Sequence, residues 1–195
     1  FHMERLKERW GILWKTYYRN FEKFSVLEKI SLSFIFTVLT GFSAQIFIRL
    51  PFTPVPVTGQ VFTVLLSGIL LGKNYGSLSQ ILYLSGGILG VRWFAANGSG
   101  ILTPTGGYII GFIFASYLTG FFSEKRKDMI FLMYVMLAGI SVIYLSGMLW
   151  LAFYLKISIK KAFYLGVLPF IPVDIIKAYI AGIISHSIIK NQEGV

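Results

Sequence analysis

Five long stretches without a charged residue divide this chain, and they constrain its fold more than any other feature. Each supplies roughly the 20 residues that a helix needs to cross the hydrocarbon core of a membrane. They cover residues 30–48, 50–72, 74–91, 93–123 and 129–155. A sixth apolar segment follows Pro172. Only 13% of the residues are charged, about half the share of a soluble domain. The pattern predicts an all-α membrane protein with six transmembrane helices in one compact bundle.

The domain organisation follows from these stretches. Residues 1–3 have the character of a tag remnant, and residues 30–190 are the expected transmembrane domain. Between them, residues 4–29 mix basic and aromatic side chains, which is typical of an amphipathic helix in the membrane interface. We favour anchoring to the lipid bilayer over nucleic-acid binding for this helix. The absence of cysteine excludes disulfides and thiolate metal sites.

Lysine and arginine residues predict the orientation of the bundle. With six spans, twelve of the 18 fall on the side of both termini and five on the other side. Cytoplasmic loops carry the excess of positive charge in membrane proteins. Both termini are therefore expected in the cytoplasm and the protein in the cytoplasmic membrane, although Lys156, Lys160 and Lys161 run against this bias.

Proline marks one face of the bundle as irregular. All six prolines lie in or beside the first, third and fifth connections between spans: Pro51, Pro54, Pro56, Pro104, Pro169 and Pro172. Proline breaks the helical hydrogen-bond ladder. Irregular backbone at a membrane is tolerated where protein or a water-lined cavity satisfies its polar groups. The outer face is therefore expected to carry the binding site.

Two charged residues lie within the last apolar segment. Asp174 and Lys177 are spaced i, i+3 and share one side of a helix that begins near Pro172. Ionisable residues within a membrane are costly and usually mark a ligand or ion route. An internal ion pair that only pins the helix is the alternative.

Three segments on the same face resemble a known family. They read Pro-x-Pro-Val-Thr-x-Gln at 54–60, Pro-Thr-Gly-Gly-Tyr at 104–108 and Pro-Phe-x-Pro-x-Asp-x-x-Lys at 169–177. In these ordered motifs the chain resembles the BioY family, the biotin-specific substrate-binding components of energy-coupling-factor transporters. The resemblance implies capture of biotin, as a transported ligand with no cofactor. It also implies docking on a transmembrane coupling protein that is driven by two ATP-hydrolysing subunits.

The chemistry of biotin indicates which residues would contact it. Its ureido group offers two N–H donors and a carbonyl acceptor, which suit Asp174 and Lys177 through charge-assisted hydrogen bonds. Arg92 is the candidate for the carboxylate of the valerate tail, and Ile109 stands where some family members carry a base. The other candidates supply polar groups, aromatic walls or close backbone approach. They are Asn97, Tyr108, Gln60, Thr58, Trp93, Phe94, Gly106 and Gly107.

Small residues recur every four positions in the first span. One row holds Ser33, Thr37 and Gly41, and a second holds Thr40 and Ala44. Such faces let membrane helices approach closely. In the family that the chain resembles, small residues on the first helix form the docking face for the coupling protein. Docking and internal packing are both open for this face.

Structural roles are also open for several of these residues, and the function has alternatives. Thr58 and Gln60 could cap or bridge helices, and Trp93 and Phe94 could be interfacial anchors. The alternatives to biotin uptake are a component for another vitamin or for lipoate, and a membrane assembly protein without transport activity. An enzyme is not expected, because the spans hold no metal-ligand cluster and no second acid. No glycine run is followed by the Lys-Ser or Lys-Thr of a phosphate-binding loop.

Overall fold

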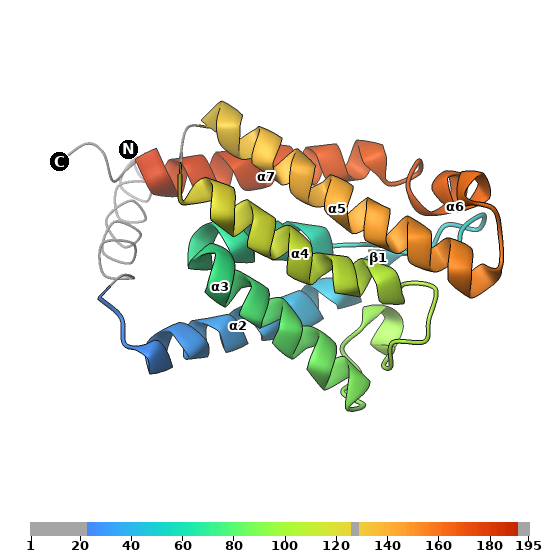
Figure 1. Ribbon diagram of the computed structural model, residues 1–195, viewed down its shortest axis with the longest axis horizontal. Helices are drawn as coiled ribbons and strands as arrows, with labels where there is room; N and C mark the ends of the chain where they lie inside the picture. Colours follow the sequence, from blue (N-terminus) through green and yellow to red (C-terminus); the bar gives the residue numbers. More distant parts are fainter. Residues whose placement is uncertain (1–22, 126–128, 191–195) are drawn as a thin grey trace, which may run out of the picture.

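The structure is a computed structural model that describes residues 23–125 and 129–190 (Figure 1). Within these ranges, helices form a bundle and two short strands pair beside it. The elements in chain order are α2 (Val26–Gln45), β1 (Phe47–Ile48), β2 (Val57–Thr58), α3 (Gln60–Ile88), η1 (Ala95–Asn97), α4 (Gly106–Ser123), α5 (Met129–Leu155), α6 (Ile159–Gly166) and α7 (Ile171–Lys190). The helical prediction holds, and the antiparallel β1–β2 pair is an addition to it. Most of the predicted interfacial helix and the tag remnant lie outside the described residues.

Serine side chains set where α2 and α6 begin. The hydroxyl of Ser25 accepts from the backbone N–H of Glu28, whose carboxylate accepts from the N–H of Ser25 at 2.7 Å. Ser158 accepts in the same way from the N–H of Lys161 at the start of α6. Such caps satisfy N–H groups that have no partner within the helix. The predicted interfacial segment, residues 4–29, therefore overlaps the start of α2, which begins directly after Ser25.

Gly72 divides α3 into two arms that lie side by side and antiparallel. Its backbone (φ 74°, ψ 175°) is in a region that only glycine adopts readily. Across the arms, Gln60 Nε2 donates to the hydroxyl of Tyr83 at 2.7 Å. Closer to the turn, Gln80 Nε2 donates to Ser67 Oγ at 3.2 Å. The arms are the helices predicted for the second and third spans, with the turn at the expected position beside Lys73.

The predicted spans differ from the observed helices at their outer ends. Residues 50–59 and 93–105 lie outside regular helix except for the short η1. The first arm of α3, residues 60–71, is about 18 Å long at 1.5 Å per residue, shorter than a hydrocarbon core of about 30 Å. The prolines explain the difference, because Pro51, Pro54 and Pro56 keep the preceding segment extended.

Four helices of the described chain are long and apolar enough to cross a membrane: α2, α3, α4 and α5 from Ile130. A fifth crossing results if α6 and the start of α7, bent by 53° relative to each other, act as one span. If α3 is divided at Gly72, the described residues hold six α-helices besides the short α6. The prediction that all six cross the membrane stays a prediction. The protein is therefore a multi-pass membrane protein.

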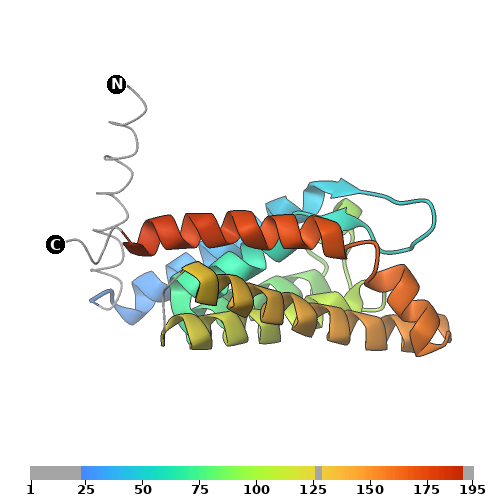
Figure 2. The ribbon, with the colours of Figure 1, turned by 90° about the horizontal axis from the view of Figure 1, so that it is seen from above.

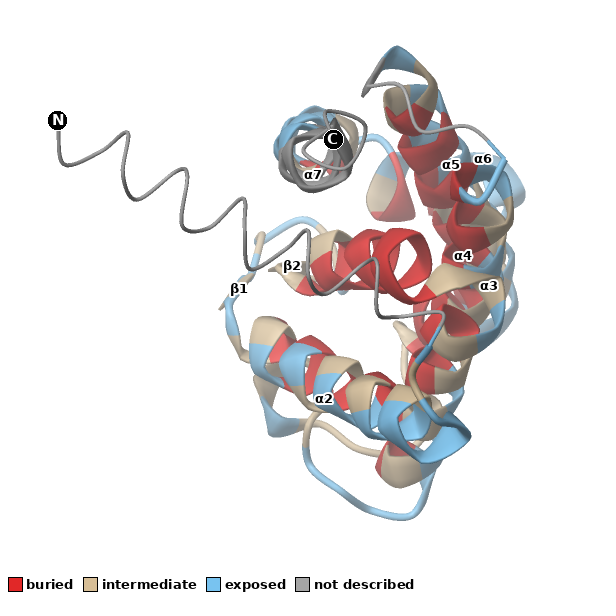
Figure 3. Ribbon diagram, turned by 90° about the vertical axis from the view of Figure 1, so that its left-hand side faces the viewer, coloured by how far each residue is buried: buried red, intermediate tan, exposed pale blue. Residues whose placement is uncertain are grey.

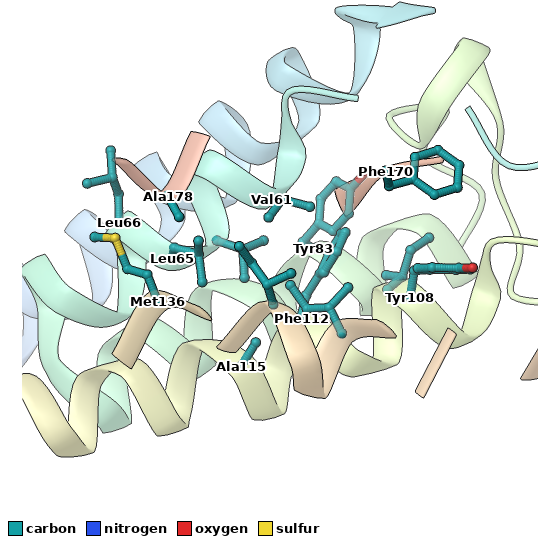
Figure 4. Packing of buried hydrophobic residues seen from close by; sticks show 14 of the residues in the cluster. Val61, Leu65, Leu66, Tyr83, Tyr108, Phe112, Ala115, Met136, Phe170 and Ala178 are labelled. Carbon is teal, nitrogen blue, oxygen red and sulfur yellow. The ribbon is translucent and has the colours of Figure 1, made fainter. Parts of the chain in front are cut away.

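The buried core lies around the first arm of α3. This arm contacts α2 on one side and α7 on the other (Figures 2 and 3), and α4 packs against both α3 and α5. Leu65, Phe112 and Ala115 belong to one apolar cluster that extends to Tyr108 and Phe170 (Figure 4). The cluster thus leads to the end of the bundle where the irregular segments meet.

Hydrogen bonds tie the irregular segments together at that end. Gln45 at the end of α2 donates to the carbonyl oxygens of Trp93 and Phe94 at 3.2 and 3.1 Å. The Thr53 hydroxyl, between β1 and β2, donates to the carbonyl of Leu165 in α6 at 2.6 Å. The proline-bearing connections therefore gather at one end of the bundle, as expected, opposite the Gly72 turn (Figure 1).

Candidate binding site

Asp174 and Lys177 form a buried ion pair in the first turns of α7. Lys177 Nζ lies 2.6 Å from Asp174 Oδ1, and the side chains of Lys177 and Asp174 are 16% and 5% exposed. Lys177 Nζ also donates to the backbone oxygen of Thr58 in β2 at 2.6 Å. The other carboxylate oxygen, Oδ2, accepts from the hydroxyl of Tyr144 in α5 at 2.7 Å. The pair thus joins α5, α7 and β2.

The pair keeps hydrogen-bonding capacity for a ligand. An ammonium group has three protons and a carboxylate has about four acceptor sites. In the described structure, Lys177 uses two protons and Asp174 accepts two hydrogen bonds. A ligand N–H can therefore bind Asp174, and a ligand oxygen can bind Lys177, without breaking the ion pair. Pinning of α7 and ligand binding are compatible roles for these two residues.

A narrow inner chamber opens beside the ion pair, with walls from β2, α3, α4, α5 and α7. Five residues expected from the sequence line it: Thr58, Gln60, Tyr108, Asp174 and Lys177. Phe112, Ile143 and Tyr144 are among its other lining residues. Its cavity volume is about 50 Å³, room for a few water molecules.

A wider outer chamber adjoins the inner one. The two share Pro56, Ala95 and Thr105 as lining residues, and the outer chamber has a cavity volume of about 560 Å³. Its walls are the β1–β2 loop, the segment around η1 and the turn before α4. Arg49 is its charged lining residue. The sequence analysis did not select Arg49 as a site residue. The one sequence feature that could have indicated it is its position two residues before Pro51, the first proline of that outer connection.

Gln60 is held by a network of hydrogen bonds behind the inner chamber. Its Oε1 accepts from the Thr58 hydroxyl at 3.0 Å, and its Nε2 donates to the hydroxyl of Tyr83. That hydroxyl donates to the backbone oxygen of Trp93 at 3.0 Å, and Trp93 Nε1 donates back to the carbonyl of Tyr83. Both amide atoms of Gln60 thus have fixed partners. The indole of Trp93 supports the chamber from outside and does not line it.

Three further predicted residues lie in or near the segment around η1. Phe94 is buried against Gly87 and Tyr83 and lines the outer chamber. Asn97 is exposed with φ 56°, and its backbone N–H donates to Gln45 Oε1 at 3.2 Å. Arg92 is also exposed. Neither Asn97 nor Arg92 lines either chamber.

The Gly-Gly-Tyr turn packs α4 tightly against α5. A Cβ at Gly107 would clash with the side chain of Trp150, and a Cβ at Gly106 would clash with the backbone oxygen of Ile101. The glycines therefore allow close helix packing and do not line the chambers. Tyr108 lines the inner chamber, and its hydroxyl donates to the carbonyl of Gly166 in α6 at 2.6 Å.

The row of small residues on α2 faces α3. All five members are buried: Ser33, Thr37, Thr40, Gly41 and Ala44. The hydroxyls of Ser33 and Thr37 donate to the carbonyl oxygens of Tyr75 and Ser79 at 2.9 and 2.8 Å. The opposite face of α2 exposes large apolar side chains such as Phe34 and Phe42. In this structure the small residues are packed inside the bundle; docking of this face on a coupling protein stays a prediction.

Comparisons with known proteins agree with one another. The chain matches the model of the BioY family over residues 16–193. It is 43% identical over 167 residues to a probable biotin transporter BioY of Pyrococcus horikoshii, covering 84% of this chain and 98% of the relative. It is 39% identical over 154 residues to the biotin transporter BioY of Thermotoga maritima, covering 77% and 89%.

A solved structure is also similar over most of its length. It is described as the S-component for biotin from an ECF-type ABC transporter. The TM-score is 0.77 at 26% sequence identity, with 84% of this chain and 92% of that chain covered. The similarity therefore extends from sequence to the arrangement of the helices.

Proposed function

The chain belongs to the BioY family, and from this membership we propose that it captures biotin for uptake. It acts as the substrate-binding component of an energy-coupling-factor transporter. The observation that carries the proposal is the buried Asp174–Lys177 pair at the bottom of a chamber that the three sequence motifs build together. Relatives and the similar solved structure are described as biotin proteins.

The ureido group of biotin suits the ion pair. Asp174 accepts from a ureido N–H, and Lys177 donates its remaining proton to the ureido oxygen. Both bonds are charge-assisted and lie in a buried site, where such bonds are stronger than in water. The hydroxyl of Tyr144 orients the carboxylate by binding its other oxygen. Apolar walls at Phe112 and Ile143 suit the thioether ring.

The narrow inner chamber supports capture in a closed pocket. Because about 50 Å³ cannot hold a bicyclic ring, the ring enters when the walls separate. The loop between β1 and β2 and the segment around η1 form those walls at the outer end, and both consist of irregular backbone. Movement of these segments therefore limits entry and exit of biotin.

We propose that this pocket lies on the outer side of the cytoplasmic membrane. The proposal has six crossings, with the extended segment before Gln60 completing the crossing of the first arm of α3. Both termini lie in the cytoplasm, where twelve of the 18 basic residues then stand. An accessibility assay with single cysteines at Asn74 and Pro51 tests this, because the protein has no native cysteine. A membrane-impermeant thiol reagent applied to intact cells should label only position 51.

The partners are a transmembrane coupling protein and two ATP-hydrolysing subunits. The chain itself carries no phosphate-binding loop motif. ATP hydrolysis is accordingly assigned to the partners, and the ligand crosses when this component moves against the coupling protein. Co-purification of the chain with such subunits, and ATP-dependent biotin uptake by the assembly, would test this part of the proposal.

Calorimetric titration of the detergent-purified protein with biotin, lipoate and thiamine tests the ligand. Biotin should bind tightly and raise thermal stability, by about 2.7 kcal/mol at a hundred times its dissociation constant. Lipoate has an acid tail but no ureido group, so it should bind far more weakly. If lipoate or thiamine binds more strongly than biotin, that compound would be assigned as the ligand instead. Absence of binding by all three would favour an assembly role.

A further inference from the structure

We infer that the outer chamber is a carboxylate subsite in which Arg49 binds the acid end of the biotin tail. The inference rests on the proposed function, because it assumes that the ureido ring occupies the inner chamber. The two chambers share Pro56, Ala95 and Thr105. A tail that leaves the ring passes these three residues and enters the outer chamber.

Among the described residues, each chamber is lined by one cation. Lys177 lines the inner chamber and Arg49 lines the outer one, and the other lining residues of both carry no positive charge. The pairing of β1 with β2 connects the position of Arg49 to that of Lys177. Ile48 pairs with Val57, one residue before Thr58, whose carbonyl binds Lys177. Arg49 follows Ile48 of β1 directly, so the two paired strands connect the residue that binds Lys177 with the outer cation.

Arg49 is available to an anionic ligand. Acidic residues in the described chain are Glu28, Glu124 and Asp174; none of them forms an ion pair with Arg49, and Asp174 is paired with Lys177. The guanidinium lies 5.6 Å from the ring centroid of Phe47, which favours an orientation along β1. A guanidinium offers a planar fork of donors that fits a carboxylate.

Hydroxyl groups from other lining segments add donors. Ser99 lines the outer chamber, and its hydroxyl has no hydrogen-bond partner among the described residues. Thr103 and Thr105 also line it, with their hydroxyl oxygens 3.2 Å apart. A carboxylate bound by Arg49 in this chamber could also accept from these hydroxyl groups. By contrast, Arg92 lines neither chamber, and Ile109 lines the inner one without a charge.

The test compares biotin with biotin carboxamide, which keeps the ring and tail but has no negative charge. Calorimetry on the wild-type protein should show weaker binding of the carboxamide, by about tenfold, because one exposed charge-assisted contact is lost. In Arg49→Gln, biotin should weaken by the same factor and the carboxamide should stay unchanged. Arg49→Lys should retain part of the preference. The wild-type preference should also fall as salt concentration rises.

Two matched variants control for the loss of a positive charge. Arg92→Gln tests the arginine that the sequence suggested, and Lys156→Gln removes an exposed charge that lines neither chamber. Both should keep the wild-type preference for biotin over the carboxamide. Loss of the preference in Arg92→Gln, with retention in Arg49→Gln, would overturn the inference.

The remaining outcomes separate this inference from the proposed function. Equal binding of biotin and carboxamide by the wild-type protein would overturn the carboxylate subsite alone. An equal loss of both ligands in Arg49→Gln, with no change in their ratio, would show a structural role for Arg49 and also overturn it. Failure of the wild-type protein to bind either ligand would instead reject the proposed function.

Discussion

The hydroxyl of Tyr144 donates to Asp174 Oδ2 at 2.7 Å and so connects the middle of α5 to the first turns of α7. The bond leaves the other carboxylate oxygen to Lys177. It thereby decides which oxygen of Asp174 faces the cation and how the carboxylate is turned toward the chamber. Positioning of the ion pair depends on a tyrosine in a helix that has no charged residue.

Replacement of Tyr144 by phenylalanine should weaken biotin binding by about five- to tenfold, because the carboxylate loses the donor that orients it. Calorimetric titration measures the change. Tyr134→Phe is the control, since Tyr134 lies on the exposed face of the same helix. Equal affinities in wild type and Tyr144→Phe would show that the hydroxyl has no part in the site.

Removal of one member of the Asp174–Lys177 pair should cost more stability than removal of both. Asp174→Leu leaves an unpaired buried ammonium, with an expected loss of about 3 kcal/mol or more. The double variant Asp174→Leu with Lys177→Met replaces the pair by apolar groups and should recover most of this loss. Thermal unfolding in detergent reports stability. Biotin binding should be abolished in both variants.

The double variant therefore separates two roles of the pair. Recovered stability without binding would assign ligand recognition to these charges. If the double variant unfolds as readily as the single one, the charges themselves hold α7 in place. If it still binds biotin tightly, the ureido group must bind elsewhere in the pocket.

Gly41→Leu should lower both stability and biotin affinity. A Cβ at Gly41 would lie 3.2 Å from Trp93 Cβ, and Trp93 supports the Tyr83–Gln60 network behind the inner chamber. Ser31→Leu is the control on the exposed face of α2. Thermal unfolding and titration of both variants measure the effect. Normal biotin binding with loss of assembly onto the coupling subunits would instead assign the small-residue face to docking.

Gly72→Ala should destabilise the protein by about 1–3 kcal/mol, because alanine disfavours the backbone at φ 74° and ψ 175°. Its Cβ would also lie 2.9 Å from Glu124 Oε1, the group that accepts from the N–H of Lys73. Gly90→Ala is the matched control, since Gly90 has φ 100° but no atom within 4 Å of an added Cβ. A larger loss at Gly90 would contradict the role of the Glu124 contact. Thermal unfolding compares the two.

Motifs in the sequence predicted five of the residues that line the inner chamber. Thr58, Gln60, Tyr108, Asp174 and Lys177 come from three distant segments and line one cavity. Each lies at the start of a helix or just before one, where a motif of a few residues fixes local backbone. The same segments carry the prolines, so their gathering at one end of the bundle was also predictable.

The remaining site residues could not be placed from the sequence, for physical reasons. In a membrane helix both faces are apolar, so hydropathy does not show which face meets protein, and the row at Gly41 is compatible with either role. Arg92 and Arg49 both border a span, but only the fold shows which of them lines a chamber. Tyr144 lies in a stretch with no charge, and its partner is 30 residues away.

Two hydrogen bonds connect the walls of both chambers to α6, where they end on neighbouring carbonyl groups. Thr53, from the loop that lines the outer chamber, binds the carbonyl of Leu165, and Tyr108, from the inner chamber, binds that of Gly166. A shift of either wall is therefore transmitted to the same turn of one short helix. A fluorescent label at the exposed Lys161 of α6 would then report whether the pocket is filled, from a position that touches neither the ligand nor its path.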